Sequence, residues 1–253
     1  MDFTLSSYKQ LLQNLIKRDY IFQTVQEFFQ LPEDRCIILR HDVDRKPKNA
    51  LKVAKLENEL EIKATYYFRT DPASWDEKII REISELGHEI GYHYENMDTC
   101  NGNLYKAWGD FRNNLNKLRE IIEVKTICMH GSPRSKYDNK DIWKKYDYRS
   151  LEIIGEPYYD LDFDKVFYLT DTSRRWDGWK TSVRDKVVQQ KEWIKQGLFY
   201  HSTNDIIKAI KENRFPNQTM FTMHPQRWTD NPILWTKELV WQNTKNIIKK
   251  HFL

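Results

Sequence analysis

Short apolar runs alternate with amphipathic helical patterns along most of this 253-residue sequence, and no other feature constrains its fold so strongly. Helical spacing of apolar residues is clear between Leu11 and Ile16 and again between Phe111 and Ile122. The strand-like runs cover residues 36–41, 62–69, 89–93, 126–130, 151–154, 166–169, 198–201 and 219–224. Repeated strand–helix units are typical of parallel sheets. The sequence therefore predicts an α/β fold with a barrel-like or doubly wound parallel sheet.

The sequence also indicates the boundaries of two helices near the end of the chain. Ser202, Thr203 and Asn204 offer caps for a helix that Pro216 closes, and Pro232 suits the first position of the last helix. No repeat, linker or change in composition divides the chain. We therefore expect a single domain over residues 1–253.

The composition excludes several classes of protein. The longest apolar runs are far shorter than the ~20 residues of a membrane helix, so we expect no membrane span. The first residues show no secretory signal, and the three cysteines form no CxxC pair, which favours a cytoplasmic protein. The formal charge of +4 is spread along the chain. Lys245, Lys249 and Lys250 end a helical pattern, where they complement the helix dipole, so we expect no nucleic-acid partner.

Polar residues collect where the predicted strands end. Asp42, Asp44, Arg69 and Asp171 lie at or just after strand ends. Five of the seven histidines also end strands: His41, His93, His130, His201 and His224. Active sites of parallel α/β barrels lie at the carboxyl ends of the strands. Imidazole and carboxylate together suit zinc and similar divalent ions, so the pattern predicts a metal site.

Asp42 and Asp44 are two residues apart and face the same side if the strand continues through them. Two such carboxylates repel each other unless a cation lies between them or one holds a proton. One Asp would bind the metal, and the other would act as a base toward water. His88 and His93, five residues apart, point to opposite faces of a strand. His93 is therefore the better ligand, and His88 is expected to be structural.

Five segments resemble, in order, the motifs of the polysaccharide deacetylase family, the NodB-type enzymes of carbohydrate esterase family 4. The run Gly-His-Glu-Ile-Gly-Tyr-His at residues 87–93 resembles that family's motif nearly letter for letter. The other segments are residues 42–44, 62–68, 168–176 and 221–225. The resemblance extends from about residue 36 to residue 228, and the ordered set is more specific than any one motif.

This resemblance implies a deformed (β/α) barrel of about seven strands and a hydrolase that uses one divalent metal ion, most commonly zinc. Carried over by position, Asp42 is the general base and His224 the general acid. Asp44 and His93 are metal ligands. Because Val43 separates two Asp residues that are adjacent in the usual motif, the assignment of base and ligand between them stays open.

The sequence departs from the family pattern at the third metal ligand. Met97 stands where a second histidine is usual, and a thioether is a poor ligand for such ions. We expect His130 to replace it, with Glu95 or no third protein ligand as the alternatives. Arg134 matches the family's arginine motif only loosely, and Arg40 or Arg69 are substitutes. The predicted substrate-binding residues are Arg69, Arg134, Asp171, Trp176 and Trp228.

The resemblance implies removal of an N-acetyl group from an amino sugar. For a cytoplasmic protein, the expected substrate is a sugar nucleotide or a lipid-linked glycan during assembly of O-antigen or capsule. Two other functions stay open. Met97 favours a glycan-binding protein with a degraded site, and relatives of this fold also hydrolyse cyclic amides that are not sugars.

Overall fold

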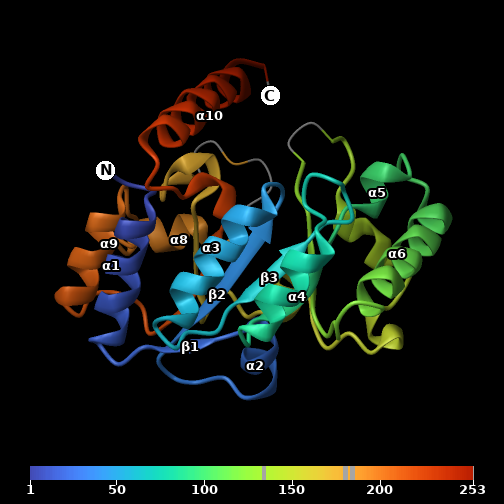
Figure 1. The fold of residues 1–253 in the computed structure, drawn as a ribbon, viewed down its shortest axis with the longest axis horizontal. Coiled ribbons are helices and arrows are strands. Elements are labelled where there is room, and N and C mark those ends of the chain that lie inside the picture. The colour runs from blue at the N-terminus through green and yellow to red at the C-terminus, as the bar shows by residue number, and fades with distance from the viewer. Residues whose placement is uncertain (133–134, 179–181, 183–185, 253) are drawn as a thin grey trace.

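A curled sheet of seven parallel strands forms the centre of the protein (Figure 1). The computed structural model describes residues 1–132, 135–178, 182 and 186–252. The strands are β1 (Ile21–Gln23), β2 (Cys36–Val43), β3 (Thr65–Phe68), β4 (Glu89–Tyr94), β5 (Ile127–Met129), β6 (Phe167–Thr170) and β7 (Gln218–Met223).

The strand order is β5-β4-β3-β2-β7-β6, and β1 pairs with the first half of β2. All of the strand pairs are parallel. The two end strands, β5 and β6, are not paired with each other within the described residues, so the barrel is incomplete. The predicted fold class, a deformed (β/α) barrel of about seven parallel strands, is confirmed.

Helices cover the sheet and connect its strands (Figure 1). The α-helices are α1 (Leu5–Ile16), α2 (Val25–Gln30), α3 (Pro47–Asn58), α4 (Glu77–Glu85), α5 (Asn96–Thr99), α6 (Leu104–Arg119), α7 (Pro157–Asp160), α8 (Gln190–Lys195), α9 (Thr203–Lys211) and α10 (Pro232–Phe252). Short 3₁₀ turns are η1 (Asn139–Lys144), η2 (Tyr148–Leu151), η3 (Thr172–Arg174) and η5 (Pro225–Arg227). Within the described residues, no helix is long and apolar enough to cross a bilayer.

Two predicted strands are wrong. In the predicted strand 151–154, Leu151 is the last residue of η2, and Glu152 takes a left-handed backbone conformation (φ 59°) that ends any extended run. Residues 198–201 follow Gly197 (φ 77°) and pair with no strand in the described part of the chain. Conversely, β1 was not predicted, because it is only three residues long and its Ile21 is exposed.

The two faces of β2 carry different chemistry, although all eight of its residues are buried. Arg40 and Asp42 alternate with His41, which lies on the opposite face. There His41 stacks on Tyr66 and places its Nε2 atom 2.7 Å from Oε1 of Glu57 in α3. Tyr8 of α1 and Tyr66 donate hydrogen bonds to the same carboxylate. This buried network ties two helices to the sheet, which agrees with a structural role for His41.

Gly91 of β4 allows the sheet to pack tightly against the Tyr67 ring. A Cβ atom at this position would lie 2.2 Å from Cε1 of the buried Tyr67 ring and 3.0 Å from the carbonyl oxygen of Thr126. The Tyr67 ring is also fixed by a 2.9 Å hydrogen bond from its hydroxyl to Thr126 Oγ1. Therefore neither neighbour can move away cheaply.

We predict that Gly91→Ala lowers the free energy of unfolding by about 1–3 kcal/mol, because overpacking displaces Tyr67. Urea denaturation measures this change. Gly109→Ala in α6 is the matched control, since its added Cβ meets nothing within 4 Å. The control should gain about 0.5–1 kcal/mol from helix propensity. Equal effects of the two variants would contradict the packing argument.

Candidate active site

Four side chains predicted from the sequence come together at the carboxyl edge of the sheet. Asp44 follows β2, His93 lies in β4, His130 follows β5 and His224 follows β7. Asp44 Oδ1 lies 3.7 Å from His93 Nε2 and 3.6 Å from His130 Nε2. Its second oxygen, Oδ2, lies 3.9 Å from His224 Nε2. One carboxylate therefore faces three imidazole rings.

The Oδ1 atom of Asp44 is buried and has no hydrogen-bond partner among the described residues. Oδ2 accepts a 3.1 Å hydrogen bond from Gln226. Burial raises the pKa of Asp44, but the imidazoles of His93, His224 and His130 outweigh it and hold the pKa well below its usual range. An ionised oxygen without a donor is costly when buried, so this position favours a cation.

Each of two imidazoles is fixed through its other nitrogen. His93 Nδ1 donates to the carbonyl oxygen of Cys128 at 2.9 Å, which leaves Nε2 facing Asp44. His130 Nδ1 lies 2.9 Å from Glu95 Oε2. Such outer partners orient metal-binding histidines in proteins generally.

Glu95 is itself held by Arg69. The Arg69 guanidinium donates to both Glu95 oxygens at 2.8 Å and to the carbonyl oxygen of Asp44 at 3.1 Å. Burial raises the pKa of Glu95, yet His130 and Arg69 together bring it down to about 2. Burial lowers the pKa of His130, but Glu95 and Asp44 reverse this and raise it. The surroundings of His130 therefore also favour a positive charge beside Asp44.

The donor set fits a divalent metal ion. One carboxylate oxygen and two imidazole nitrogens are typical zinc ligands, and ligands at about 2.0–2.2 Å from a tetrahedral ion lie roughly 3.3 Å apart. Asp44 Oδ1 is only slightly farther from the two nitrogens. As the side chains of the described residues lie, no group of three or more His, Cys, Asp or Glu is placed so that it could hold a metal ion. The side chains of Asp44, His93 and His130 would have to move closer together to bind one.

Glu95 and Met97 do not complete this set. Both oxygens of Glu95 are engaged by Arg69 and His130, so Glu95 supports a ligand instead of being one. Met97 is buried in α5.

Asp42 forms a buried ion pair with Arg40. The guanidinium donates to Asp42 Oδ1 at 2.8 Å and to Oδ2 at 2.7 Å. Burial raises the pKa of Asp42, but Arg40, His93 and His224 hold it below its ordinary value. Asp42 Oδ2 lies 3.7 Å from His93 Nε2, so an ionised carboxylate borders the Asp44 cluster. Arg40 is therefore the arginine that lies beside Asp42. The sequence had left Arg134, Arg40 and Arg69 as candidates for this role.

His224 has a dedicated carboxylate partner. Its Nδ1 lies 2.6 Å from Asp171 Oδ1, and its backbone N–H donates to Asp171 Oδ2. Arg227 and Trp228 donate the remaining hydrogen bonds to Asp171. Burial and Arg227 lower the pKa of His224, while Asp171 and Asp44 raise it, and the net direction is upward. The Nε2 atom faces the cluster and can carry a proton there.

Three of the predicted substrate contacts do not fit this structure. Asp171 is fully buried, and Trp176 and Trp228 are each 2% exposed, so none of them can touch a sugar. Trp228 instead orients Asp171, and Trp176 donates to Thr203 within the core. Arg69 holds Glu95 in place, and Arg134 lies outside the described residues.

Gln226, which donates to Asp44, was not predicted from the sequence. Its place two residues after His224 was the available signal, but a glutamine at that position has many other uses. His201, which also ends a predicted strand, lies away from this group, with Nδ1 2.9 Å from Asp177.

No family model matches this sequence, and no curated protein does. A solved structure of a carbohydrate esterase 4 family pseudoenzyme from Bacillus anthracis, in a mutant with restored enzymatic activity, is 12% identical with a TM-score of 0.48. The match covers 87% of this chain but only 65% of that chain, less than two thirds of its length.

Two further solved structures show a similarly low sequence identity to this chain. PdaA of Bacillus subtilis, a family 4 carbohydrate esterase, is 13% identical over 93% of this chain and 84% of its own, with a TM-score of 0.46. The esterase domain of a xylanase from the hindgut metagenome of Trinervitermes trinervoides is 11% identical over 84% of both chains, with a TM-score of 0.44.

We predict that Asp171→Asn lowers the pKa of His224. Without the carboxylate charge, only Asp44 still favours the protonated ring, while burial and Arg227 disfavour it. An NMR titration of the His224 ring protons measures the change. Asp177→Asn is the control, because Asp177 binds His201 in the same way and should leave His224 unaffected. An unchanged His224 titration in Asp171→Asn would refute the assignment.

Proposed function

We propose that this protein is a metal-dependent hydrolase that removes an N-acetyl group from an amino sugar. The observation that carries the proposal is the unpartnered Asp44 oxygen facing His93 and His130, with the ionised Asp42 on one side and His224 on another. The combination supplies a cation site, a base and an acid within one group of side chains.

The metal ion would be held by Asp44, His93 and His130. When bound, it would polarise the acetyl carbonyl and lower the pKa of water. Asp42, kept ionised by Arg40, takes a proton from the attacking water. The water oxygen forms a bond to the carbonyl carbon as the carbon–nitrogen bond breaks. His224 donates its Nε2 proton to the leaving amine, and Asp171 stabilises the charged ring beforehand.

The substrate that we propose is an acetylated amino sugar, carried as a sugar nucleotide or a lipid-linked glycan during assembly of a surface polysaccharide such as O-antigen or capsule. The ordered sequence motifs support this choice. The cluster is partly open to solvent, because the Asp44 and His130 side chains are 23% and 18% exposed while His93 and His224 are nearly buried.

We predict about one zinc-like ion per chain in protein purified without chelator, by elemental analysis. His93→Ala and His130→Ala should each lose it, because each removes one of three donors. His201→Ala is the control, since this histidine is half-exposed and bound to Asp177, and it should retain the ion.

Wild-type protein that binds no ion even after addition of zinc would exclude the hydrolase and leave the glycan-binding protein. Retention of the ion in His130→Ala alone would remove His130 from the ligand set.

We predict that Asp42→Asn and His224→Ala lower kcat about 10²–10⁴-fold while the metal content stays that of the wild type, since these groups transfer protons and bind no metal. Acetate release from an N-acetylated hexosamine oligosaccharide measures the rate. Full activity in either variant would disprove its role. Activity on cyclic amides combined with none on acetylated sugars would redirect the substrate class.

A further inference from the structure

The last helix, α10, lies outside the main body of the protein (Figure 1). Its buried side is polar. Glu238 and Gln242, four residues apart, are buried against the protein. Glu238 binds Arg45 at 2.9 Å and Lys46 at 3.5 Å. Asn246, one turn further, donates to the carbonyl oxygen of Ser173. This is the reverse of an ordinary surface helix, which buries its apolar face.

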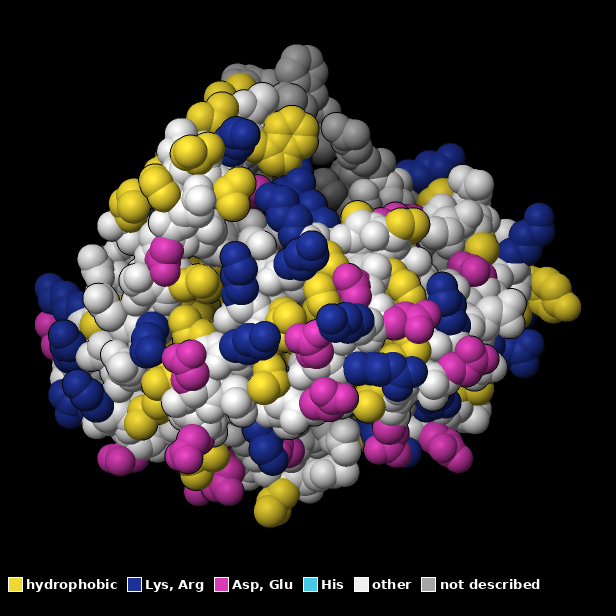
Figure 2. All heavy atoms as spheres, viewed as in Figure 1, with side chains coloured by type: hydrophobic (Ala, Val, Ile, Leu, Met, Phe, Trp, Pro, Cys, Tyr) yellow, Lys and Arg dark blue, Asp and Glu magenta, His cyan; other side chains and the backbone are white. Residues whose placement is uncertain are grey.

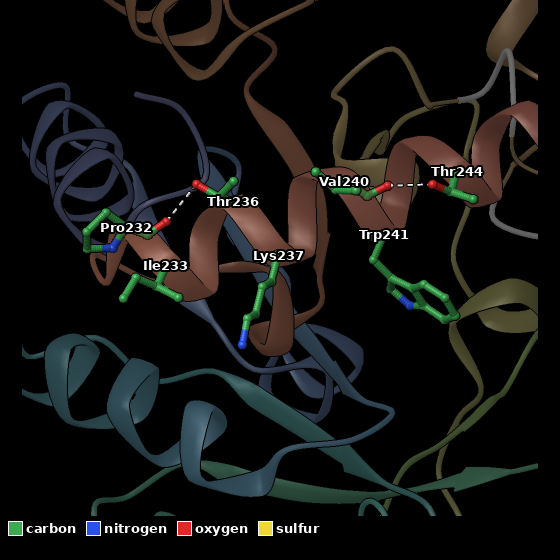
Figure 3. A pocket seen from close by; sticks show the side chains of 7 residues that line it. All are labelled: Pro232, Ile233, Thr236, Lys237, Val240, Trp241 and Thr244. Carbon is green, nitrogen blue, oxygen red and sulfur yellow. Dashed lines mark hydrogen bonds between the residues drawn. The ribbon is translucent and has the colours of Figure 1, made fainter.

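The apolar side of α10 points to solvent. Ile233, Val240, Trp241 and Ile247 are 65%, 60%, 50% and 61% exposed. Figure 2 shows hydrophobic side chains gathered along this helix. A shallow hollow runs beside it, and every residue that lines the hollow belongs to α10 (Figure 3). Ile233, Lys237 and Trp241 point to the same side in that view. Contiguous exposed apolar surface of this kind marks an interaction site.

The charges of α10 restrict what can cover this surface. From Pro232 to Phe252 the sequence contains four lysines and one glutamate. The glutamate, Glu238, is turned inward and neutralised by Arg45 and Lys46. Lys237 lies within the apolar surface itself, and Lys245 extends over the Trp241 ring at 4.8 Å from its centroid. The outward side is therefore apolar and cationic together.

We propose that α10 docks this protein on an anionic lipid bilayer, lying in the interface with Val240, Trp241 and Ile247 directed into the lipid. An apolar face with lysines beside it and a tryptophan at its edge is the pattern of interfacial helices. Lysine stems extend along apolar surface while their ammonium groups reach anionic headgroups.

A second copy of the chain is a poorer partner for the same surface. A twofold contact brings the same face of both copies together. Lys237 would then be desolvated inside the contact, and no carboxylate of α10 points outward to pair with it. Lipid headgroups supply the missing negative charge.

The position of α10 also relates the membrane to the site. Its inward face rests on Arg45 and Lys46, which directly follow β2 and Asp44, and on Ser173, which follows β6. The helix is thus held by loops at the carboxyl edge of the sheet. If the proposed function holds, on which this step rests, the placement of α10 favours the lipid-linked glycan over the soluble sugar nucleotide as substrate.

The experiment is sedimentation with vesicles of phosphatidylcholine and phosphatidylglycerol, and with vesicles of phosphatidylcholine alone. Wild-type protein should sediment with the anionic vesicles, and added salt should weaken this binding. Val240→Glu should weaken it about tenfold or more, because it removes apolar burial and adds repulsion. Asn113→Glu, an exposed position in α6, makes the same change of charge and should stay within about twofold of the wild type.

Circular dichroism establishes that both variants are folded, and size-exclusion chromatography without lipid measures their oligomeric state. Wild-type protein that stays in the supernatant with anionic vesicles at low salt would overturn the proposal. So would a wild-type dimer that Val240→Glu converts to monomer, which would assign the surface to a second copy. Neither readout depends on metal or on deacetylation, so the proposed function can fail while the docking surface stands.

Discussion

Buried charge on the central strand is the constraint from which the arrangement of this protein follows. β2 is buried along its whole length, yet it carries Arg40, His41 and Asp42 in succession. A buried charge without a partner is strongly destabilising. Arg40 and Asp42 form an ion pair on one face, and Glu57 contacts His41 on the other. The strand can thus bring charged groups into the interior while α1 and α3 remain tied to the sheet.

The same principle orders the candidate site. Each histidine there has one nitrogen committed to an acceptor: a carbonyl oxygen for His93, Glu95 for His130 and Asp171 for His224. The other nitrogen is left facing Asp44. The two carboxylates are in turn held, Glu95 by Arg69 and Asp171 by Arg227 and Trp228. The rings cannot turn without breaking these bonds, so the cluster is preorganised for a cation and for proton transfer.

The sequence predicted the fold class and the grouping of Asp42, Asp44, His93, His130 and His224 because strand periodicity and strand ends are local properties. It could not predict partners that depend on packing. Trp176 and Trp228 follow motif residues, yet their rings turn into the core, and only the three-dimensional structure shows their burial. Gln226 and Glu95 act through residues distant in sequence. Residues 198–201 had strand-like composition but no neighbouring strand with which to pair.

The distribution of the candidate ligands over the sheet has a mechanical consequence. Asp44, His93 and His130 extend from β2, β4 and β5, whereas Met97, one helical turn beyond His93 in sequence, is buried in α5. A ligand pair within one helical turn holds an ion without joining distant elements. When the ligands extend from three strands, a bound ion links those strands at one end of the sheet. One of the linked strands is the edge strand β5. Occupancy of the site is thereby linked to the cohesion of that edge, since whatever binds only the folded state stabilises it.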